Sequence, residues 1–301
     1  MQATPTKILD ERRFPVSLRE DITPIRELYD RGKEERWNPK TDIAWDQLDL
    51  SSYDAEVLKA AALTWSRRTW IEYAGLYETP AFLVRLCLEL GREADPKYFL
   101  TVRNTEEAWL IESFHRYADA LGGYQHQPTE PATEQLFNQY RHRNVLDADK
   151  DVDALFATHA VAEDGLELAL YKAYLENMQE PVGRQILEKA VLSKQRNIDF
   201  GWSYLTSLAA GWDEKKRESV GVAIQSYLQE IELNGYHCAW LGNRSGDEAI
   251  AAEITADYGL GSAAVAQEEK IVRDYIDVLR AELKKIHIPL GNLIHLQLDV
   301  L

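Results

Sequence analysis

A glutamate and a histidine three residues apart, Glu112 and His115, lie in the middle of a stretch with helical texture, TEEAWLIESFHRYADALGG. Residues at positions i and i+3 share one face of a helix. Helical bundles use this spacing to bring a carboxylate and an imidazole to a shared interior metal. The pair therefore makes a metal site in a helical bundle the first hypothesis, although Glu-x-x-His on its own also arises easily by chance.

Neighbouring helical stretches carry further acids among apolar and aromatic residues. Glu72 lies in TWIEYAGL, and Glu163 and Glu167 lie in HAVAEDGLELAL, with His159 one turn earlier. A carboxylate on an apolar face must be paired, coordinated or protonated, because burial without a partner is costly. Glu72 and Glu112 are at similar distances from a turn centred near residue 93, so we expect them to lie at the same height of a helical hairpin.

The elements that must position these side chains are long helices. Apolar residues recur at intervals of three and four from Ser51 onward, and Gly91 and the pair Asp95-Pro96 separate the first two helices. The four predicted long helices span about residues 51–90, 97–121, 151–177 and 182–210, with a short connecting helix at 134–142. These form two hairpins, and strand signals are nearly absent.

This pattern predicts an all-α protein with one domain. Residues 1–50 form an N-terminal arm around one short helix, with Pro5, Pro15, Pro24 and Pro39 spaced along it. Residues 51–211 form a four-helix core. Residues 212–301 add C-terminal helices, at about 214–233, 247–258 and 262–286, which we expect to pack on the core. The C-terminal histidines His237, His287 and His295 are far in sequence from the core helices, so we expect structural roles for them.

Charge and composition exclude several classes of function. The 301 residues include 34 Lys+Arg against 50 Asp+Glu, a formal net charge of −16. Such a surplus of negative charge repels phosphate backbones and anionic lipids, so nucleic acid and membrane surfaces are not expected partners. Only two cysteines occur, Cys87 and Cys238, and no stretch has the apolar length of a membrane span or the pattern of a signal peptide. These features predict a cytoplasmic protein.

The order of these elements resembles the ferritin-like diiron carboxylate superfamily. This group includes the ribonucleotide reductase small subunit, the R2-like ligand-binding oxidases, the acyl carrier protein desaturases and the bacterial multicomponent monooxygenases. Its pattern is a Glu on the first helix, ExxH on the second, a Glu on the third and a second ExxH on the fourth. The resemblance covers roughly residues 25–210 and includes the arm motif RWNPKTDIAW and the stretch EPVGRQILEKAVLSKQRNIDFGWSYL. It implies a ferritin-like four-helix bundle.

The fourth helix departs from that pattern. Members with an intact site resemble D-E-x-R-H-x-x-F-G there, and the matching stretch is SKQRNIDFG, residues 193–201. Arg196, Phe200 and Gly201 remain, whereas Lys194 replaces the bridging Glu and Asn197 replaces the His. A charged lysine has only donors, and an asparagine is a poor substitute for imidazole. A standard two-iron site is therefore not expected.

Two arrangements of the remaining candidate ligands stay open. The candidates are Glu72, Glu112, His115 and either Glu163 or Glu167, and hairpin geometry does not choose between the last two. In one arrangement Lys194 contacts at least one of these acids as an internal counter-ion, and no metal is bound. In the other, a single iron or manganese ion binds to the mixed set of carboxylates and imidazole.

These arrangements correspond to different functions. The leading hypothesis is a diverged member of the oxygenase/oxidase branch that acts as a non-catalytic, accessory partner of a metal-bearing paralogue, as a homo- or hetero-oligomer with another ferritin-like subunit. The enzyme alternative is an oxidoreductase that uses O2 and one iron or manganese ion on a small organic substrate. A third hypothesis is a module that binds a small molecule in the vacated cavity.

Overall fold

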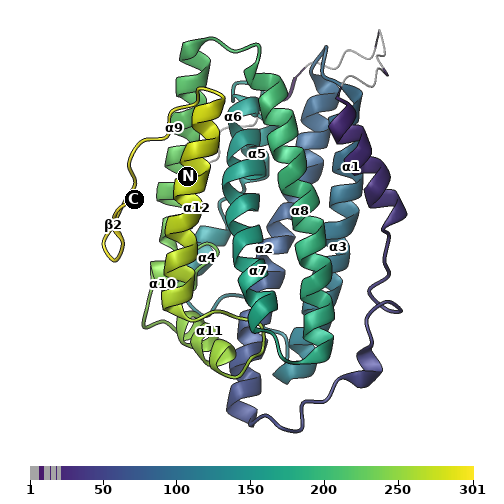
Figure 1. The fold of residues 1–301 in the computed structure, drawn as a ribbon, viewed down its shortest axis with the longest axis vertical. Helices are drawn as coiled ribbons and strands as arrows, with labels where there is room; N and C mark the ends of the chain where they lie inside the picture. Colours follow the sequence, from purple (N-terminus) through teal and green to yellow (C-terminus); the bar gives the residue numbers. More distant parts are fainter. Residues whose placement is uncertain (1–6, 10–13, 15–17, 19–21) are drawn as a thin grey trace.

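A computed structural model describes residues 7–9, 14, 18 and 22–301. Four long helical segments run side by side and form a bundle (Figure 1). Three of the four segments are single helices: α2 (Ala55–Leu88), α3 (Ala94–Gly122) and α8 (Pro181–Ala209). The remaining segment comprises α6 (Val152–Ala157), a π-helical turn η2 (Thr158–Glu163) and α7 (Asp164–Asn177). Proline 80 lies inside α2, which continues through it.

The ends of these helices follow from local sequence. The Asp151 side chain accepts hydrogen bonds from the backbone of Asp153 and Ala154 at the start of α6. Glu180 caps α8 in the same way, and Pro181 occupies the first turn, where its missing N–H costs nothing. Gly123 ends α3 with φ 107°, a conformation that favours glycine.

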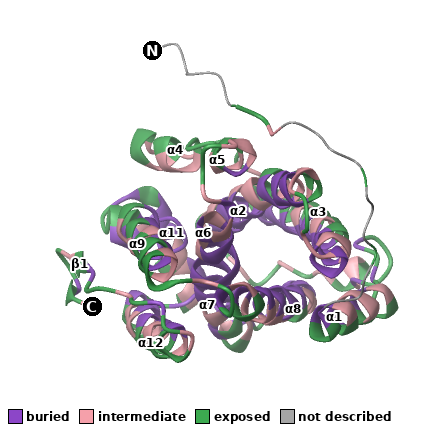
Figure 2. Ribbon diagram, turned by 90° about the horizontal axis from the view of Figure 1, so that it is seen from above, coloured by how far each residue is buried: buried purple, intermediate pink, exposed green. Residues whose placement is uncertain are grey.

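The remaining helices surround the bundle. They are α1 (Thr23–Glu34), α4 (Pro131–Phe137), α5 (Arg141–Leu146), α9 (Glu214–Glu230), α10 (Ala239–Gly242), α11 (Asp247–Asp257) and α12 (Val265–Lys285). Viewed from above, α1 lies outside α3 and α8, whereas α9, α11 and α12 cover the opposite side (Figure 2). The helix predicted at 134–142 is instead two short helices, α4 and α5. The C-terminal helices pack on the bundle through contacts of α11 with α2 and of α12 with α7.

Short elements complete the chain. There are 3-10 turns at η1 (Trp45–Gln47) and η3 (Glu232–Asn234), and the C-terminal tail forms a small antiparallel hairpin of β1 (Ile294–His295) and β2 (Asp299–Val300). The predicted arm positions Pro5 and Pro15 lie outside the described residues. None of the helices in the described part of the chain is both long and apolar enough to cross a membrane.

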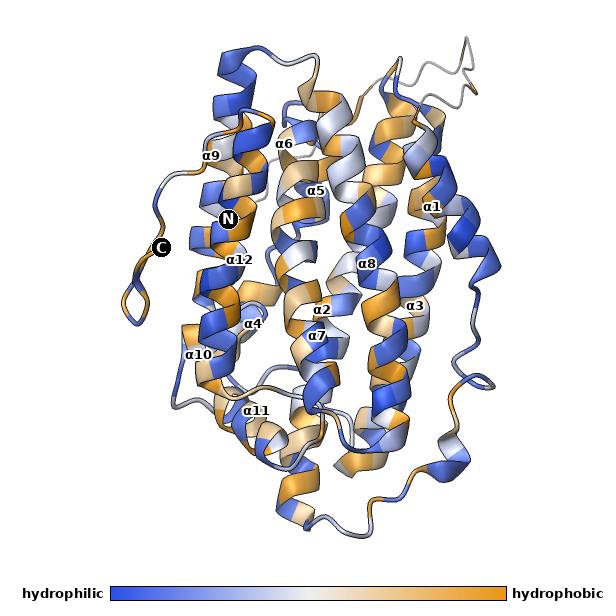
Figure 3. Cartoon of the chain, in the orientation of Figure 1, coloured by the Kyte–Doolittle hydropathy of each residue, from blue (hydrophilic) through white to orange (hydrophobic). Residues whose placement is uncertain are grey.

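The bundle buries an apolar core together with an unusual number of charged side chains. Helix α12 shows the banded blue and orange surface of an amphipathic helix (Figure 3), and its apolar face, including Val272, Ile276 and Leu279, is buried. Ionisable groups are seldom fully buried unless they are paired. The buried Glu72, Arg103 and Lys194 therefore mark the bundle interior as the place to look for a site.

Candidate functional site

Lys194 lies at the centre of the bundle between two glutamates. Its Nζ is 2.8 Å from Oε1 of Glu72 on α2 and 2.7 Å from Oε2 of Glu167 on α7. All three residues are buried, with exposed fractions of 2–4%. The ammonium therefore occupies the position between carboxylates that a bridging cation would take, as expected of an internal counter-ion.

The protonation of this group follows from burial and from the lysine charge. Burial, the largest effect, raises the pKa of Glu72 to about 8, although Lys194 opposes the shift. Burial also disfavours the charged form of Glu167, but Lys194 and His237 outweigh it and lower the pKa of Glu167 to about 2. The two acids in turn raise the pKa of Lys194 against the effect of its burial. The Lys194 ammonium thus balances the ionised carboxylate of Glu167, whereas Glu72 keeps its proton to a higher pH than a free glutamate does.

His237 extends this cluster from the C-terminal part of the chain. Its Nε2 lies 3.8 Å from Oε1 of Glu167, and its Nδ1 lies 2.8 Å from Oε2 of Glu232. Burial alone would lower the pKa of His237, but Glu232 and Glu167 raise it to about 10. The imidazolium is therefore a second cation beside Glu167. Sequence separation had suggested only a structural role, because no spacing linked residue 237 to the core helices.

Arg103 on α3 supplies a further internal cation. Its guanidinium contacts Oε1 of Glu107 at 2.9 Å and both oxygens of Asp164 at 2.6 and 2.9 Å. The hydroxyl of Thr79 donates to the same Glu107 oxygen at 2.8 Å. The two parallel hydrogen bonds between the guanidinium and the Asp164 carboxylate hold both side chains in a defined relative orientation. Arg103 thus holds α3 to the third long segment inside the bundle.

A group of three ligand-type side chains adjoins Arg103. Glu78, His159 and Glu163 have ligand atoms within 4.8 Å of one another, and all three residues are buried. The π-helical turn η2 sets this arrangement, because it places His159 Nδ1 2.9 Å from Oε2 of Glu163. Such turns occur frequently at functional sites. Arg141 of α5, however, contacts Glu78 at 2.9 Å and Glu163 at 2.6 Å.

The residues at the bundle centre do not fit a two-metal site. Lys194 is fully engaged with two carboxylates, and Arg103 with two more. Asn197 is completely buried, and its side-chain nitrogen and oxygen have no hydrogen-bond partner among the described residues. A neutral amide cannot replace imidazole as a ligand, and ammonium and guanidinium groups are donors only. The chain's own cations therefore occupy the space between these carboxylates.

The expected interior position of Glu112 and His115 is wrong. Both residues are exposed on α3, and the His115 ring contacts the Tyr124 ring at 4.5 Å between centroids. The turn position near residue 93 is correct, since Thr79 meets Glu107 across the hairpin. The error concerns the helix face: Glu112 is five residues beyond Glu107, which is a rotation of about 140° at 3.6 residues per turn. The residue three positions after Glu107 is Leu110, so this face of α3 lacks a histidine.

The two acids of the third segment, which sequence left unresolved, have separate roles. Glu167 contacts Lys194, whereas Glu163 contacts Arg141 and His159. Sequence reasoning missed Glu107, Arg103 and Asp164, and the available signal was the pairing of Arg103 and Glu107 four residues apart on one helix face. Arg141 offered no such signal, because it arrives from a separate short helix.

The scaffold residues of the fourth helix hold its register. Arg196 pairs with Glu106 of α3 and also lies 2.5 Å from Oε2 of Glu35. The Phe200 ring stacks on Phe99 with 4.4 Å between centroids. A side chain at Gly201 would collide with the Ala160 carbonyl, so glycine permits the close approach of α8 to the π-helical turn.

Comparison with solved structures relates this arrangement to known proteins. The chain resembles a single-residue variant of an R2-like ligand-binding oxidase with an aerobically reconstituted Mn/Fe cofactor: TM-score 0.63, 19% sequence identity, 86% of this chain and 93% of the other covered. Another solved structure of an R2-like ligand-binding oxidase, with an aerobically reconstituted metal cofactor after photoconversion, gives a TM-score of 0.55 at 20% identity over 88% of this chain and 90% of the other. No protein-family model and no curated protein matches the sequence.

This likeness shows the fold. The chain is an all-α protein with the ferritin-like fold of the R2-like ligand-binding oxidases. Function depends on the residues placed in such a fold rather than on the fold itself.

Proposed function

We propose that this chain is a non-catalytic, accessory member of the diiron oxygenase/oxidase branch, whose bundle centre is closed by its own cations. The observation that carries the proposal is the position of Lys194 Nζ, 2.8 Å from Glu72 and 2.7 Å from Glu167. Removing one partner from a buried ion pair costs about 3–5 kcal/mol. A cation so placed supports the bundle and resists displacement by metal.

The partner in this proposal is a ferritin-like subunit that carries a complete set of ligands. The chain would assemble with it, as a hetero-oligomer, or with a second copy of itself. Two features support a structural contribution. Helices α1, α11 and α12 pack directly on the long helices, and buried ion pairs join α3 to α7 and α8 to both α2 and α7. A stable scaffold of this kind can contribute an interface without contributing chemistry.

Metal content is the first test of the proposal. The chain is produced in medium replete with iron and manganese, and bound metal is measured by mass spectrometry alongside the near-ultraviolet absorption of an oxo-bridged pair. We expect much less than one equivalent of iron or manganese and no such band. Two irons per chain with that band would overturn the proposal.

The accessory role has its own test. A metal-bearing ferritin-like subunit encoded in the same genome is purified with and without this chain, and complex mass and oxygen consumption are compared. We expect a defined complex and a higher rate in its presence. If the two proteins stay separate at micromolar concentration and the rate is unchanged, the accessory role is wrong even when the chain is free of metal.

The enzyme alternative requires one iron or manganese ion, and in the described part of the chain Glu78, His159 and Glu163 form a group that could hold it. Arg141 competes for that position through its contacts with both glutamates. Near-stoichiometric metal that is lost in His159→Gln but kept in the exposed control His115→Gln would favour this alternative over the accessory role.

A further inference from the structure

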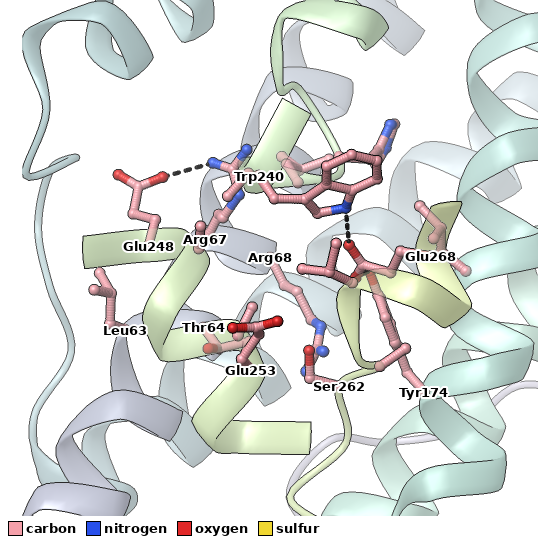
Figure 4. A pocket seen from close by; sticks show the side chains of 18 of the residues that line it. Leu63, Thr64, Arg67, Arg68, Tyr174, Trp240, Glu248, Glu253, Ser262 and Glu268 are labelled. Atoms are coloured by element: carbon pink, nitrogen blue, oxygen red, sulfur yellow. Dashed lines mark hydrogen bonds and ion pairs between the residues drawn. The ribbon is translucent and has the colours of Figure 1, made fainter. Parts of the chain in front are cut away.

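A cavity of about 40 Å³ lies between α2 and α7 on one side and α10, α11 and α12 on the other (Figure 4). Its walls are apolar in part, with Leu63, Ile71, Leu170 and Val265 among the lining residues. One water needs about 10–15 Å³ of such space, so the cavity has room for about three waters or one small organic molecule.

Buried polar atoms without partners are concentrated in the residues that line this cavity. Among the described residues, the atoms without a hydrogen bond are Arg67 Nε, Arg68 Nη1, Glu248 Oε1, Glu167 Oε1 and His237 Nε2, the last two of which lie 3.8 Å from each other as an ion pair. A buried donor or acceptor without a hydrogen bond is costly, and such atoms need a water or a ligand to explain them. The three atoms on Arg67, Arg68 and Glu248 indicate that something polar fills the cavity.

Most of the charges at the cavity have partners within the chain. Arg67 lies 2.8 Å from Glu248, and that pair is drawn with a dashed line in Figure 4. Glu167 is balanced by Lys194, and His237 lies beside Glu232. After these pairs, one buried cation at the cavity remains without a paired anion.

That cation is Arg68, which is only 5% exposed. Its guanidinium donates to the Gly261 carbonyl and lies 4.6 Å from the ring centroids of both Trp65 and Tyr174. In the part of the chain that the structure describes, no acidic group is within ion-pair distance of it. Burial, the largest effect, lowers the pKa of Arg68, and the nearby tyrosines and Glu268 offset that only in part.

Glu268 is the acid whose charge acts on Arg68, but its oxygens are engaged elsewhere. It accepts hydrogen bonds from the Tyr174 hydroxyl at 2.7 Å and from Trp240 Nε1 at 2.9 Å, the second of which is visible in Figure 4. Glu253, on α11, is exposed at the rim. Arg68 therefore lies in the cavity with an unused donor, Nη1, and without a paired anion.

We propose that this cavity binds a small monocarboxylate, whose anionic group pairs with Arg68 and whose short apolar end contacts the Leu170 and Val265 wall. The volume suits a molecule of about four non-hydrogen atoms. A phosphate dianion suits the site less well than a monocarboxylate, because the neighbouring Glu167, Glu248 and Glu268 repel a double negative charge more strongly than a single one. The cavity shares Glu167 with the Lys194 cluster, but the pairing of the ligand with Arg68 does not depend on whether the chain binds metal or has a protein partner.

Acetate is the probe for the test. Thermal unfolding of the full chain is measured in sodium acetate and in sodium chloride at matched ionic strength, and binding is measured by isothermal titration calorimetry. A ligand that binds only the folded state raises Tm, by about 2–4 °C at ten times Kd for a chain of this size. We expect a saturable rise with acetate, little change with chloride, and loss of the acetate effect in Arg68→Met.

Two further variants keep the test decisive. Arg244→Met removes an exposed arginine and should respond to acetate like the unmodified chain. Ala252→Leu fills the cavity without altering Arg68 and should abolish the response; it also decides the matter if Arg68→Met does not fold. An unmodified chain that responds equally to acetate and chloride would overturn the proposal. So would an equal acetate response in folded Arg68→Met or, if that variant does not fold, in Ala252→Leu.

Discussion

Two buried cations of this bundle differ in how their charge is balanced. Lys194 lies between Glu72 and Glu167, each within 2.8 Å of its ammonium. Arg68, on the same helix as Glu72, has a backbone carbonyl and two aromatic rings as partners. Both are almost fully buried, with exposed fractions of 3% and 5%.

The difference separates a structural ion pair from a candidate binding group. A buried pair that is complete within the chain has no need of an external ion, so its loss should appear as instability. A buried cation without an anion adds little to the folded state and should respond to an added anion. The same contrast distinguishes the Lys194 cluster, whose ion pairs are complete within the chain, from the neighbouring cavity, where Arg68 can pair with an added ligand.

The largest effect should come from Lys194→Met. This change leaves Glu72 and Glu167 buried beside each other without the ammonium, and breaking a buried pair in this way typically costs about 3–5 kcal/mol. We expect a lower midpoint in urea unfolding at pH 7 with an unchanged slope. Lys172→Met on the exposed face of α7 is the matched control and should change stability by less than about 0.5 kcal/mol. Equal stability of the Lys194→Met variant in metal-free buffer would contradict the counter-ion role.

The next effect concerns pH and Glu72. Burial raises the pKa of this acid to about 8, so between its unfolded value near 4.5 and 8 the folded state binds more protons than the unfolded state. The contribution of Glu72 to the free energy of unfolding is therefore greatest at low pH, and it declines as the pH rises from about 4.5 to about 8. Glu72→Gln removes the decline, and we expect its advantage over the unmodified chain to grow by about 1–3 kcal/mol between pH 5 and pH 8.

Urea unfolding across that pH range measures the effect. His237, whose pKa is raised to about 10, makes a similar decline above its usual value near 6.5 in both proteins, so only the difference between them reports on Glu72. Glu176→Gln, at an exposed position of α7, should leave the pH profile as it is. Parallel profiles for Glu72→Gln and the unmodified chain would show that Glu72 is ionised throughout.

The fold was predictable because helix signals are local. Capping residues, glycine stops and the 3.6-residue period set the boundaries of α2, α3 and α8 to within a few residues. Lys194 was also predictable, because its position relative to Arg196, Phe200 and Gly201 is fixed along one helix. The π-helical turn at 158–163 was not, since a one-residue change of winding leaves no period in the sequence.

The site was only partly predictable because it depends on helix rotation and on distant segments. A hairpin gives the height of Glu107 and Glu112 but not which of them faces inward, and the ExxH spacing favoured the wrong one. Arg141 comes from the short helix α5, and His237 comes from the loop between η3 and α10. Their contacts with Glu163 and Glu167 arise only in the tertiary structure.

Arg68→Met tests the other half of the comparison and should have a much smaller effect than Lys194→Met. The change loses a hydrogen bond to Gly261 and two contacts with aromatic rings, but it also removes a buried charge that lacks an anion. We expect a change in unfolding free energy within about 1 kcal/mol in chloride buffer. A loss as large as that of Lys194→Met would mean that Arg68 has a structural anion, and Glu268 would then be the residue to vary next.

The smallest effect should come from Glu112→Gln and His115→Gln, the pair whose spacing first suggested a metal. Both side chains are exposed on α3, and His115 contacts only the Tyr124 ring among its aromatic neighbours. Surface substitutions of this kind usually change stability by less than about 0.5 kcal/mol. We expect the double variant to match the unmodified chain in Tm and in cobalt binding followed by absorption, whereas a variant at His159 should alter any cobalt signal. A cobalt signal that disappears with Glu112 and His115 would place a metal site on the outer surface of α3 and separate metal binding from the bundle interior altogether.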